Sequence, residues 1–119
     1  MNTILAAHLI STELKGREIK NNYSTSDTDY GTSCYFTFYK SSESLDKLKV
    51  RVSDHSVTNV DRMNDEMLVN ASNFDVNRVV DAIEFYLHPE RFALVPATTM
   101  EKGNAYYMIS GKLQQRIKL

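Results

Sequence analysis

Two runs of alternating apolar and polar residues constrain the fold of this chain most strongly. Within residues 33–40, Cys34, Phe36 and Phe38 alternate with Tyr35, Thr37 and Tyr39, and a similar alternation returns in residues 47–53. Such a period of two predicts strands that bury one face and expose the other. The intervening residues 41–46 are polar and few, so we expect the two strands to pair as an antiparallel hairpin. The side chains expected on the buried face are Cys34, Phe36, Phe38, Leu48, Val50 and Val52.

Apolar residues at helical spacing predict two helices. Residues 3–14 form the first, which Asn2 or Thr3 can cap at its N-terminus. Residues 74–88 form the second and clearest one, which ends before Pro89 because proline lacks the N–H that a helix interior needs. We expect this second helix to cover the apolar face of the sheet. Its apolar stripe comprises Val76, Val79, Val80, Ile83 and Leu87.

The remaining segments are assigned from composition and short-range pattern. Residues 21–32 are rich in Asn, Ser, Thr, Asp and Gly, and we expect a loop that is either a plain connector or a binding loop. Residues 66–71 and 105–110 are predicted to be strands, and residues 92–95 a strand or an extended segment. Residues 112–119 either continue the preceding strand or form a short tail.

The predicted order of elements favours one fold class. A helix is followed by three strands, a second helix and one or two further strands. Strands that follow one another before a helix favour an antiparallel α+β domain over a parallel βαβ fold. We therefore expect a single α+β domain over residues 1–119, with an antiparallel sheet of three to five strands covered on one face by a helix, and an extra N-terminal helix. The opposite face of the sheet should be the more solvent-exposed one.

Charge and cysteine content exclude several classes of protein. The 119 residues include 14 basic and 15 acidic ones, a formal net charge of −1. A general nucleic-acid-binding protein usually has a basic excess, so electrostatic recognition has to come from local patches. Cys34 is the single cysteine, which excludes an intramolecular disulfide and fits a reducing cytoplasm. No run approaches the ~20 apolar residues that span a bilayer, and residues 4–10 lack the basic flank of a signal peptide.

The polar face of the predicted hairpin is the first candidate site. Alternate spacing places Lys47, Lys49 and Arg51 on one face of one strand. If the pairing brings Tyr35 and Tyr39 to the same face, basic and aromatic side chains form one surface. Such surfaces bind phosphates and stack bases. The alternative is an ordinary solvated sheet face whose charges guard against aggregation.

The second candidate site is the polar segment that ends the second strand. Ser53, Asp54, His55 and Ser56 bring acid-base and nucleophilic groups together in sequence. Adjacent residues seldom face one another, whereas a catalytic triad depends on convergent geometry. No GxGxxG, Walker A or GxSxG motif is present either. We therefore predict no catalytic residue, no metal and no cofactor. A polar strand end is one interpretation of this segment, and a recognition site that includes Asp54 and His55 is the other.

The central part of the chain resembles a known family of inhibitors. The residues that carry the likeness are Lys49-Val50-Arg51-Val52-Ser53-Asp54-His55-Ser56, Leu68-Val69-Asn70, Asp81, Ile83, Glu84 and Arg91-Phe92. Over about residues 48–92, this order is similar to the broad-spectrum type II-A anti-CRISPR family, small phage proteins that inhibit RNA-guided Cas nucleases. The chain departs from that family at its N-terminus, which is apolar here and rich in arginine in the family.

The resemblance implies a function and a partner. The chain would be a phage inhibitor that binds a Cas nuclease effector, with or without its guide RNA, and blocks DNA binding or cleavage in the cytoplasm of the host bacterium. Such an inhibitor acts by protein–protein interaction and is not an enzyme. The alternatives are a small phage or mobile-element nuclease or toxin that uses His55, and an oligomeric assembly protein. The residues expected at the interface are Tyr35, Tyr39, Lys47, Lys49, Arg51, Asp54 and His55.

Overall fold

The chain divides into two compact units, Met1–Leu87 and His88–Leu119, and each is described by itself. The residues that this computed structural model describes are 2–40, 47–59, 66–70, 74–101 and 105–119. Antiparallel sheets and α-helices together confirm the predicted α+β class. Neither of the described α-helices has the length and apolar character that crossing a membrane requires.

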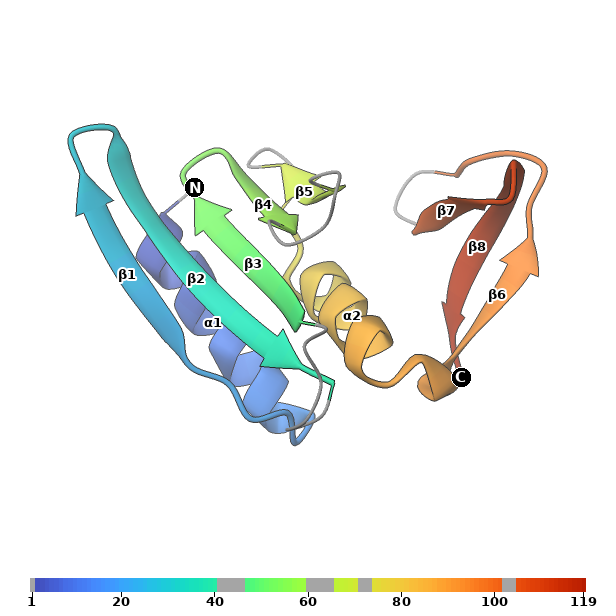
Figure 1. The fold of residues 1–119 in the computed structure, drawn as a ribbon, viewed down its shortest axis with the longest axis horizontal. Helices are drawn as coiled ribbons and strands as arrows, with labels where there is room; N and C mark the ends of the chain where they lie inside the picture. The colour runs from blue at the N-terminus through green and yellow to red at the C-terminus, as the bar shows by residue number, and fades with distance from the viewer. Residues whose placement is uncertain (1, 41–46, 60–65, 71–73, 102–104) are drawn as a thin grey trace. The chain divides into compact units, whose positions relative to one another are not determined.

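The first unit combines two α-helices with a five-stranded antiparallel sheet, within the described residues (Figure 1). Each strand pairs with the next along the chain, in the spatial order β1-β2-β3-β4-β5. The elements are α1 (Thr3–Gly16), β1 (Tyr23–Thr28), β2 (Gly31–Tyr39), β3 (Lys47–Ser53), β4 (Ser56–Asn59), β5 (Glu66–Asn70) and α2 (Val76–Leu87). The predicted helices and the predicted β2–β3 hairpin are thus confirmed, with ends that differ by a few residues.

The core of the first unit is built jointly by the helices and the central strands. The apolar side chains of β2 and β3 are buried, as their alternation predicts, and Phe36 and Val50 are fully enclosed. From the helices, the core takes Ala6, Ala7, Ile10 and Leu14 of α1, and Val79, Val80, Ile83 and Tyr86 of α2. α1 contacts β2, β3 and α2, whereas α2 contacts α1 and β5. Coverage of one sheet face by the second helix alone therefore stays a prediction.

Side-chain caps fix where both helices begin. The Asn2 side-chain oxygen accepts the Leu5 backbone N–H at 3.0 Å, which decides between the two predicted caps of α1. Asp75 serves α2 in the same way, because its carboxylate accepts the backbone N–H groups of Asn77 at 3.0 Å and Arg78 at 3.4 Å. A carboxylate at this end of a helix is also favoured by the helix dipole.

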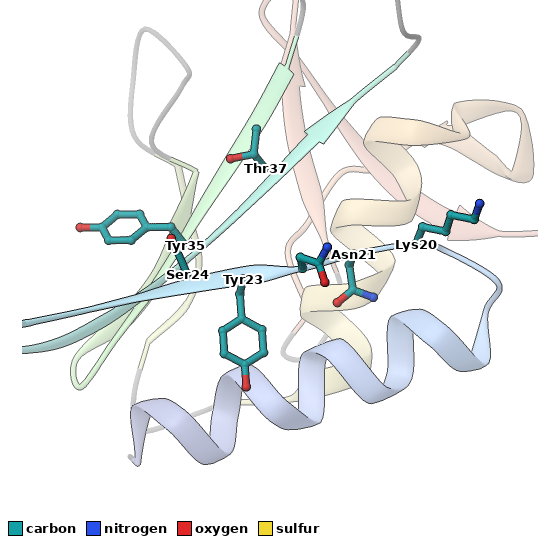
Figure 2. A pocket seen from close by; sticks show the side chains of 7 residues that line it. Lys20, Asn21, Tyr23, Ser24, Tyr35 and Thr37 are labelled. Atoms are coloured by element: carbon teal, nitrogen blue, oxygen red, sulfur yellow. The ribbon is translucent and has the colours of Figure 1, made fainter.

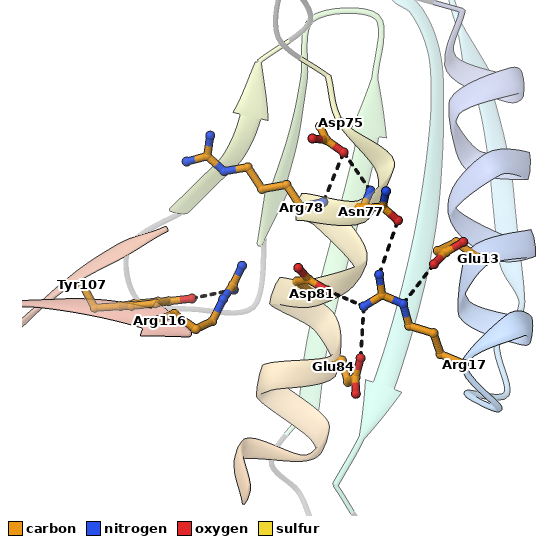
Figure 3. Close-up of polar contacts among 9 residues, drawn as sticks. All are labelled: Glu13, Arg17, Asp75, Asn77, Arg78, Asp81, Glu84, Tyr107 and Arg116. Carbon is orange, nitrogen blue, oxygen red and sulfur yellow. Dashed lines mark hydrogen bonds and ion pairs between the residues drawn. The ribbon is translucent and has the colours of Figure 1, made fainter. Parts of the chain in front are cut away.

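Arg17, the residue after α1, joins the two helices through a network of acidic side chains (Figure 3). Its guanidinium donates to Glu13 at 3.1 Å and to Glu84 at 3.0 Å, and it also pairs with Asp81 and reaches Asn77 at 3.4 Å. Burial alone would lower the pKa of Arg17, but the hydrogen bonds to Asp81, Glu13 and Glu84 raise it above its usual value. Arg17 therefore stays charged and neutralises carboxylates on both helices.

The prediction of a loop over residues 21–32 is wrong. Six of these residues form β1, which pairs antiparallel with β2 and is followed by a tight turn. Gly31 completes that turn with a φ of +120°, a value that favours glycine. β1 is exposed along nearly its whole length. A strand without a buried face has no apolar alternation, so its Ser- and Thr-rich composition resembles that of a loop.

The second unit is a three-stranded antiparallel sheet in the order β6-β8-β7. Its elements are η2 (Pro89–Arg91), β6 (Phe92–Pro96), β7 (Tyr106–Ile109) and β8 (Lys112–Lys118). Ser110 and Gly111 have positive φ values of 52° and 75°, which suit a two-residue hairpin turn. Residues 112–118 therefore form a new strand, rather than a continued strand or a tail.

This second sheet is a further difference from the sequence prediction. A single sheet of three to five strands is expected from the sequence, whereas the structure has two sheets, with five and three strands in its described part. The short strand β4 accounts for one of the extra strands, because a strand of four residues leaves too little pattern to recognise. That both units belong to one domain stays a prediction.

Candidate functional site

The register of β2 and β3 places the predicted tyrosines and cations on one face of the sheet. Tyr35 pairs with Arg51 and Tyr39 pairs with Lys47, while Lys49 lies between the two cations on β3. Directly opposite residues of an antiparallel pair point to the same face, and their sequence neighbours on both strands are buried. These five side chains therefore form one surface, which we call the basic-aromatic face. The structure confirms this placement, whereas binding at these residues stays a prediction.

The basic-aromatic face carries no acidic side chain at the described positions of β1 to β4. Its other described positions are Gly31 and hydroxyl-bearing residues, which include Ser24, Ser26, Thr28, Ser33, Thr37, Ser53 and Thr58. Many acidic groups lie elsewhere, since Glu13, Asp81 and Glu84 surround Arg17 and Asp75 caps α2. A chain with a net charge of −1 thus presents a locally positive surface.

The cations of this face differ from Arg17 in their surroundings. Within the described part of the chain, neither Lys49 nor Arg51 forms an ion pair, whereas Arg17 has three acidic partners. Arg51 is exposed and Lys49 is half-buried, and the ring of Tyr39 is 55% exposed. Lys49 and Arg51 are thus presented on the sheet beside the exposed ring of Tyr39, and neither is neutralised by an ion pair within the described residues.

A polar hollow of about 510 Å³ adjoins the basic-aromatic face (Figure 2). It is lined by Lys20, Asn21, Asn22, Tyr23, Ser24, Tyr35 and Thr37. Figure 2 shows Tyr23 directed toward α1 and Tyr35 directed away from it. Tyr35 belongs to both the hollow and the face, and Thr37 of the hollow pairs with Lys49. The two features therefore form one continuous candidate site.

Hydrogen bonds hold one wall of the hollow in place. Asn21 accepts from the Ser11 hydroxyl at 2.7 Å and donates to the carbonyl oxygens of Ser11 at 3.3 Å and Ile19 at 3.1 Å. The segment that enters β1 is thereby fixed to α1. Sequence analysis missed Lys20, Asn22 and the rest of this wall, because the pairing of β1 with β2 is what brings residues 20–24 beside Tyr35.

In the second predicted site, Asp54 and Ser53 make hydrogen bonds that support the fold. Asp54 accepts a hydrogen bond from the buried Thr3 hydroxyl, at the first turn of α1, and lies against Gly31. Ser53 closes the β3–β4 turn, because its hydroxyl accepts from the backbone N–H groups of His55 at 3.4 Å and Ser56 at 3.3 Å. This turn matches the interpretation of a polar strand end. Asp54 and His55 are both exposed, and binding at either residue stays a prediction.

The hydrogen bond from Thr3 to Asp54 should contribute to the stability of the first unit. Replacing Asp54 with alanine should lower the free energy of unfolding by about 1–2 kcal/mol, since it leaves a buried hydroxyl without its acceptor. Urea denaturation would measure the change. The exposed neighbour His55, replaced by alanine, serves as the control and should change stability by less than about 0.5 kcal/mol. Equal stability of the two variants would contradict a structural role for Asp54.

The cations near the C-terminus are arranged differently from those of the first unit. Arg116 donates to the Tyr107 hydroxyl at 2.9 Å, and its guanidinium carbon lies 5.7 Å from the centre of the Phe92 ring. Cation–π and hydrogen-bonding contacts of this kind stabilise the sheet itself. Among the described residues of the chain, no cluster of three His, Cys, Asp or Glu side chains is placed to hold a metal ion.

The basic-aromatic face and the polar hollow together form the candidate functional site of this protein. No family model matches the chain, and no curated protein or solved structure is found to be similar to it.

Proposed function

We propose that this protein is a stoichiometric inhibitor that binds an RNA-guided Cas nuclease complex through its basic-aromatic face. The observation that supports the proposal is the register of β2 and β3. It gathers two tyrosines and three cations on one face, and that face carries no acidic side chain at its described positions on β1 to β4, because Asp27 of β1 lies on the opposite face. A nuclease complex of protein and guide RNA offers phosphate groups and acidic protein surface to such a face.

The chemistry of the face suits binding better than turnover. Tyrosine and arginine are the residue types that most often dominate binding energy at interfaces. Tyr35 and Arg51 stand on paired strands whose inner side chains are fully buried, so the backbone beneath them is rigid and loses little freedom on binding. The proposed action is therefore to occupy a surface that the nuclease needs for DNA binding or cleavage.

A titration of DNA cleavage tests this function. A panel of type I and type II effectors is mixed with increasing amounts of the protein, and each mixture is also run on a sizing column. We expect inhibition that saturates near one equivalent for a susceptible effector, together with co-elution. Inhibition by amounts far below one equivalent would contradict stoichiometric binding and favour an enzyme. Absence of inhibition and of complex across the panel would overturn the proposal.

A pair of double variants tests the role of the face. Replacing Lys49 and Arg51 with alanine should weaken inhibition at least about tenfold, because both charges lie on the proposed interface. The matched control replaces Lys15 and Lys112, which are exposed cations outside the face, and should inhibit like the unchanged protein. Both variants lose two positive charges, so a difference between them reports position and not net charge. Equal inhibition by the two would remove this face from the proposed function.

A further inference from the structure

We infer that the ligand class recognised by the basic-aromatic face is single-stranded nucleic acid, with bases stacked on Tyr35 and Tyr39 and phosphates held by Lys49 and Arg51. This inference rests on the proposed function, because it names which part of a ribonucleoprotein target the face would contact. It differs from that proposal in being testable on the protein alone, without a nuclease.

The spacing of the cations supports a single strand as the ligand. Alternate residues of a strand lie about 6.8 Å apart, so Lys47, Lys49 and Arg51 form a straight row at that interval. This interval is comparable with the separation of neighbouring phosphates along an extended polynucleotide. Because all three cations lie on one strand, the backbone of β3 fixes the spacing between them. A polynucleotide lying along β3 could therefore place successive phosphates beside successive cations.

The position of the tyrosines supports base stacking beside that row. β2 and β3 are neighbours in the sheet, and paired strands are about 4.8 Å apart, so the aromatic row runs next to the cationic row. Tyr35 and Tyr39 are four positions apart on β2, or about 14 Å, which leaves room for stacking on two bases that are not adjacent. Stacking on aromatic rings is how proteins bind single strands without strict sequence preference.

The polar hollow offers groups that can read the edge of one base. Asn22 brings an amide, and Ser24 and Thr37 bring hydroxyl groups, and all three line the hollow together with Tyr35. An amide both donates and accepts, as the edge of a base does. Lys20 adds a further cation at the same place. The hydrogen bonds of Asn21 to α1 hold this wall in place before any ligand binds.

The same features argue against a duplex or an acidic peptide. In a duplex, the faces of the bases are covered by their neighbours, so Tyr35 and Tyr39 would have nothing to stack on. The carboxylates of an acidic peptide would pair with the cations. They provide no flat group to stack on the tyrosine rings and no base edge to hydrogen-bond in the polar hollow. A single strand uses the cations, the rings and the hollow together, and it is therefore the ligand that the arrangement favours.

Fluorescence anisotropy with the full-length protein tests the inference. The probes are a labelled RNA of about 12 nucleotides, a DNA of the same sequence, and the corresponding duplex, at low salt. We expect the single strands to bind at least about tenfold more tightly than the duplex. Comparison of the RNA and DNA arms shows which sugar is preferred. Equal affinity for single strand and duplex, or no binding to either, would overturn the inference.

Variants assign the binding to this face. Replacing Tyr35 or Tyr39 with alanine should weaken single-strand binding about five- to thirty-fold, whereas phenylalanine at either position should preserve it, because the ring is what stacks. Alanine at both Lys49 and Arg51 should reduce the slope of log affinity against log salt by about 1.4, as expected for two phosphate contacts. Circular dichroism confirms that each variant is folded. Unchanged affinity in all of these variants would place the binding elsewhere.

The combined results separate this inference from the proposed function. If the protein inhibits a nuclease but binds no single strand, the inference fails while the proposed function stands, and the face then meets a protein surface. If the protein binds single strands through Tyr35 and Tyr39 but inhibits no effector, the inference stands and the proposed function fails.

Discussion

Replacing Arg17 with alanine should lower the free energy of unfolding by about 3 kcal/mol. The side chain of Arg17 is only 15% exposed, and that of its partner Glu84 is 4% exposed. Without the guanidinium, the partly buried carboxylate of Asp81 and the buried carboxylate of Glu84 both lose the positive charge that offsets their mutual repulsion on α2. Removing one partner of a buried ion pair costs more than the pair itself contributes, because the remaining charge stays desolvated. Urea denaturation followed by circular dichroism measures the loss.

Two further variants make the Arg17 result specific. Lys15 also lies at the end of α1, but it is exposed, and alanine there should cost no more than about 0.5 kcal/mol. Lysine in place of Arg17 should recover part of the loss, since it restores the charge without the planar group that reaches several acceptors. If the Arg17 and Lys15 alanine variants were equally stable, the network would contribute little to holding α1 against α2.

Replacing Phe36 with alanine should destabilise the first unit by about 4 kcal/mol. Phe36 is 0% exposed on β2, and the centre of its ring lies 5.1 Å from that of Tyr23 and 6.1 Å from that of Phe38. Truncating such a ring removes its apolar contacts and leaves a cavity that the neighbours fill only in part. Because small proteins are stable by only about 5–15 kcal/mol, the urea midpoint should fall sharply.

The controls for Phe36 use the same strand. Valine at Thr37, the next residue, keeps a β-branched side chain on the exposed face and should change stability by less than about 0.5 kcal/mol. Leucine at Phe36 gives a milder loss of about 1.5 kcal/mol, and it remains measurable if the alanine variant does not fold. A Phe36 alanine variant as stable as the Thr37 valine variant would mean that β2 is not at the centre of the core.

The sequence predicts β2 and β3 and their pairing well, and the reason is physical. One face of each strand is buried, so selection for burial produces strict alternation, and a polar link of few residues leaves antiparallel pairing as the natural arrangement. That pairing then places Tyr35 opposite Arg51, which is why the shared face could be anticipated before the register was known.

The parts that sequence analysis missed depend on contacts between distant residues. β1 has no buried face, so nothing in its composition separates it from a loop until its pairing with β2 is known. The polar hollow exists only once that pairing has formed. Likewise, the carboxylate of Asp54 meets Thr3 across 51 positions of sequence, and no local pattern records such a contact.

The order of strands in the first sheet has a consequence for how the chain folds. Each strand pairs with its neighbour in sequence, so most of the sheet consists of contacts of short range, which are quick to form. The two helices are the exception, because Arg17 and Asp81 are separated by 64 positions. When α1 docks against α2, a long loop of chain is closed, and the loss of chain entropy is correspondingly large. We therefore expect a sheet built from successive hairpins to form early, and the docking of α1 with α2 to complete the unit.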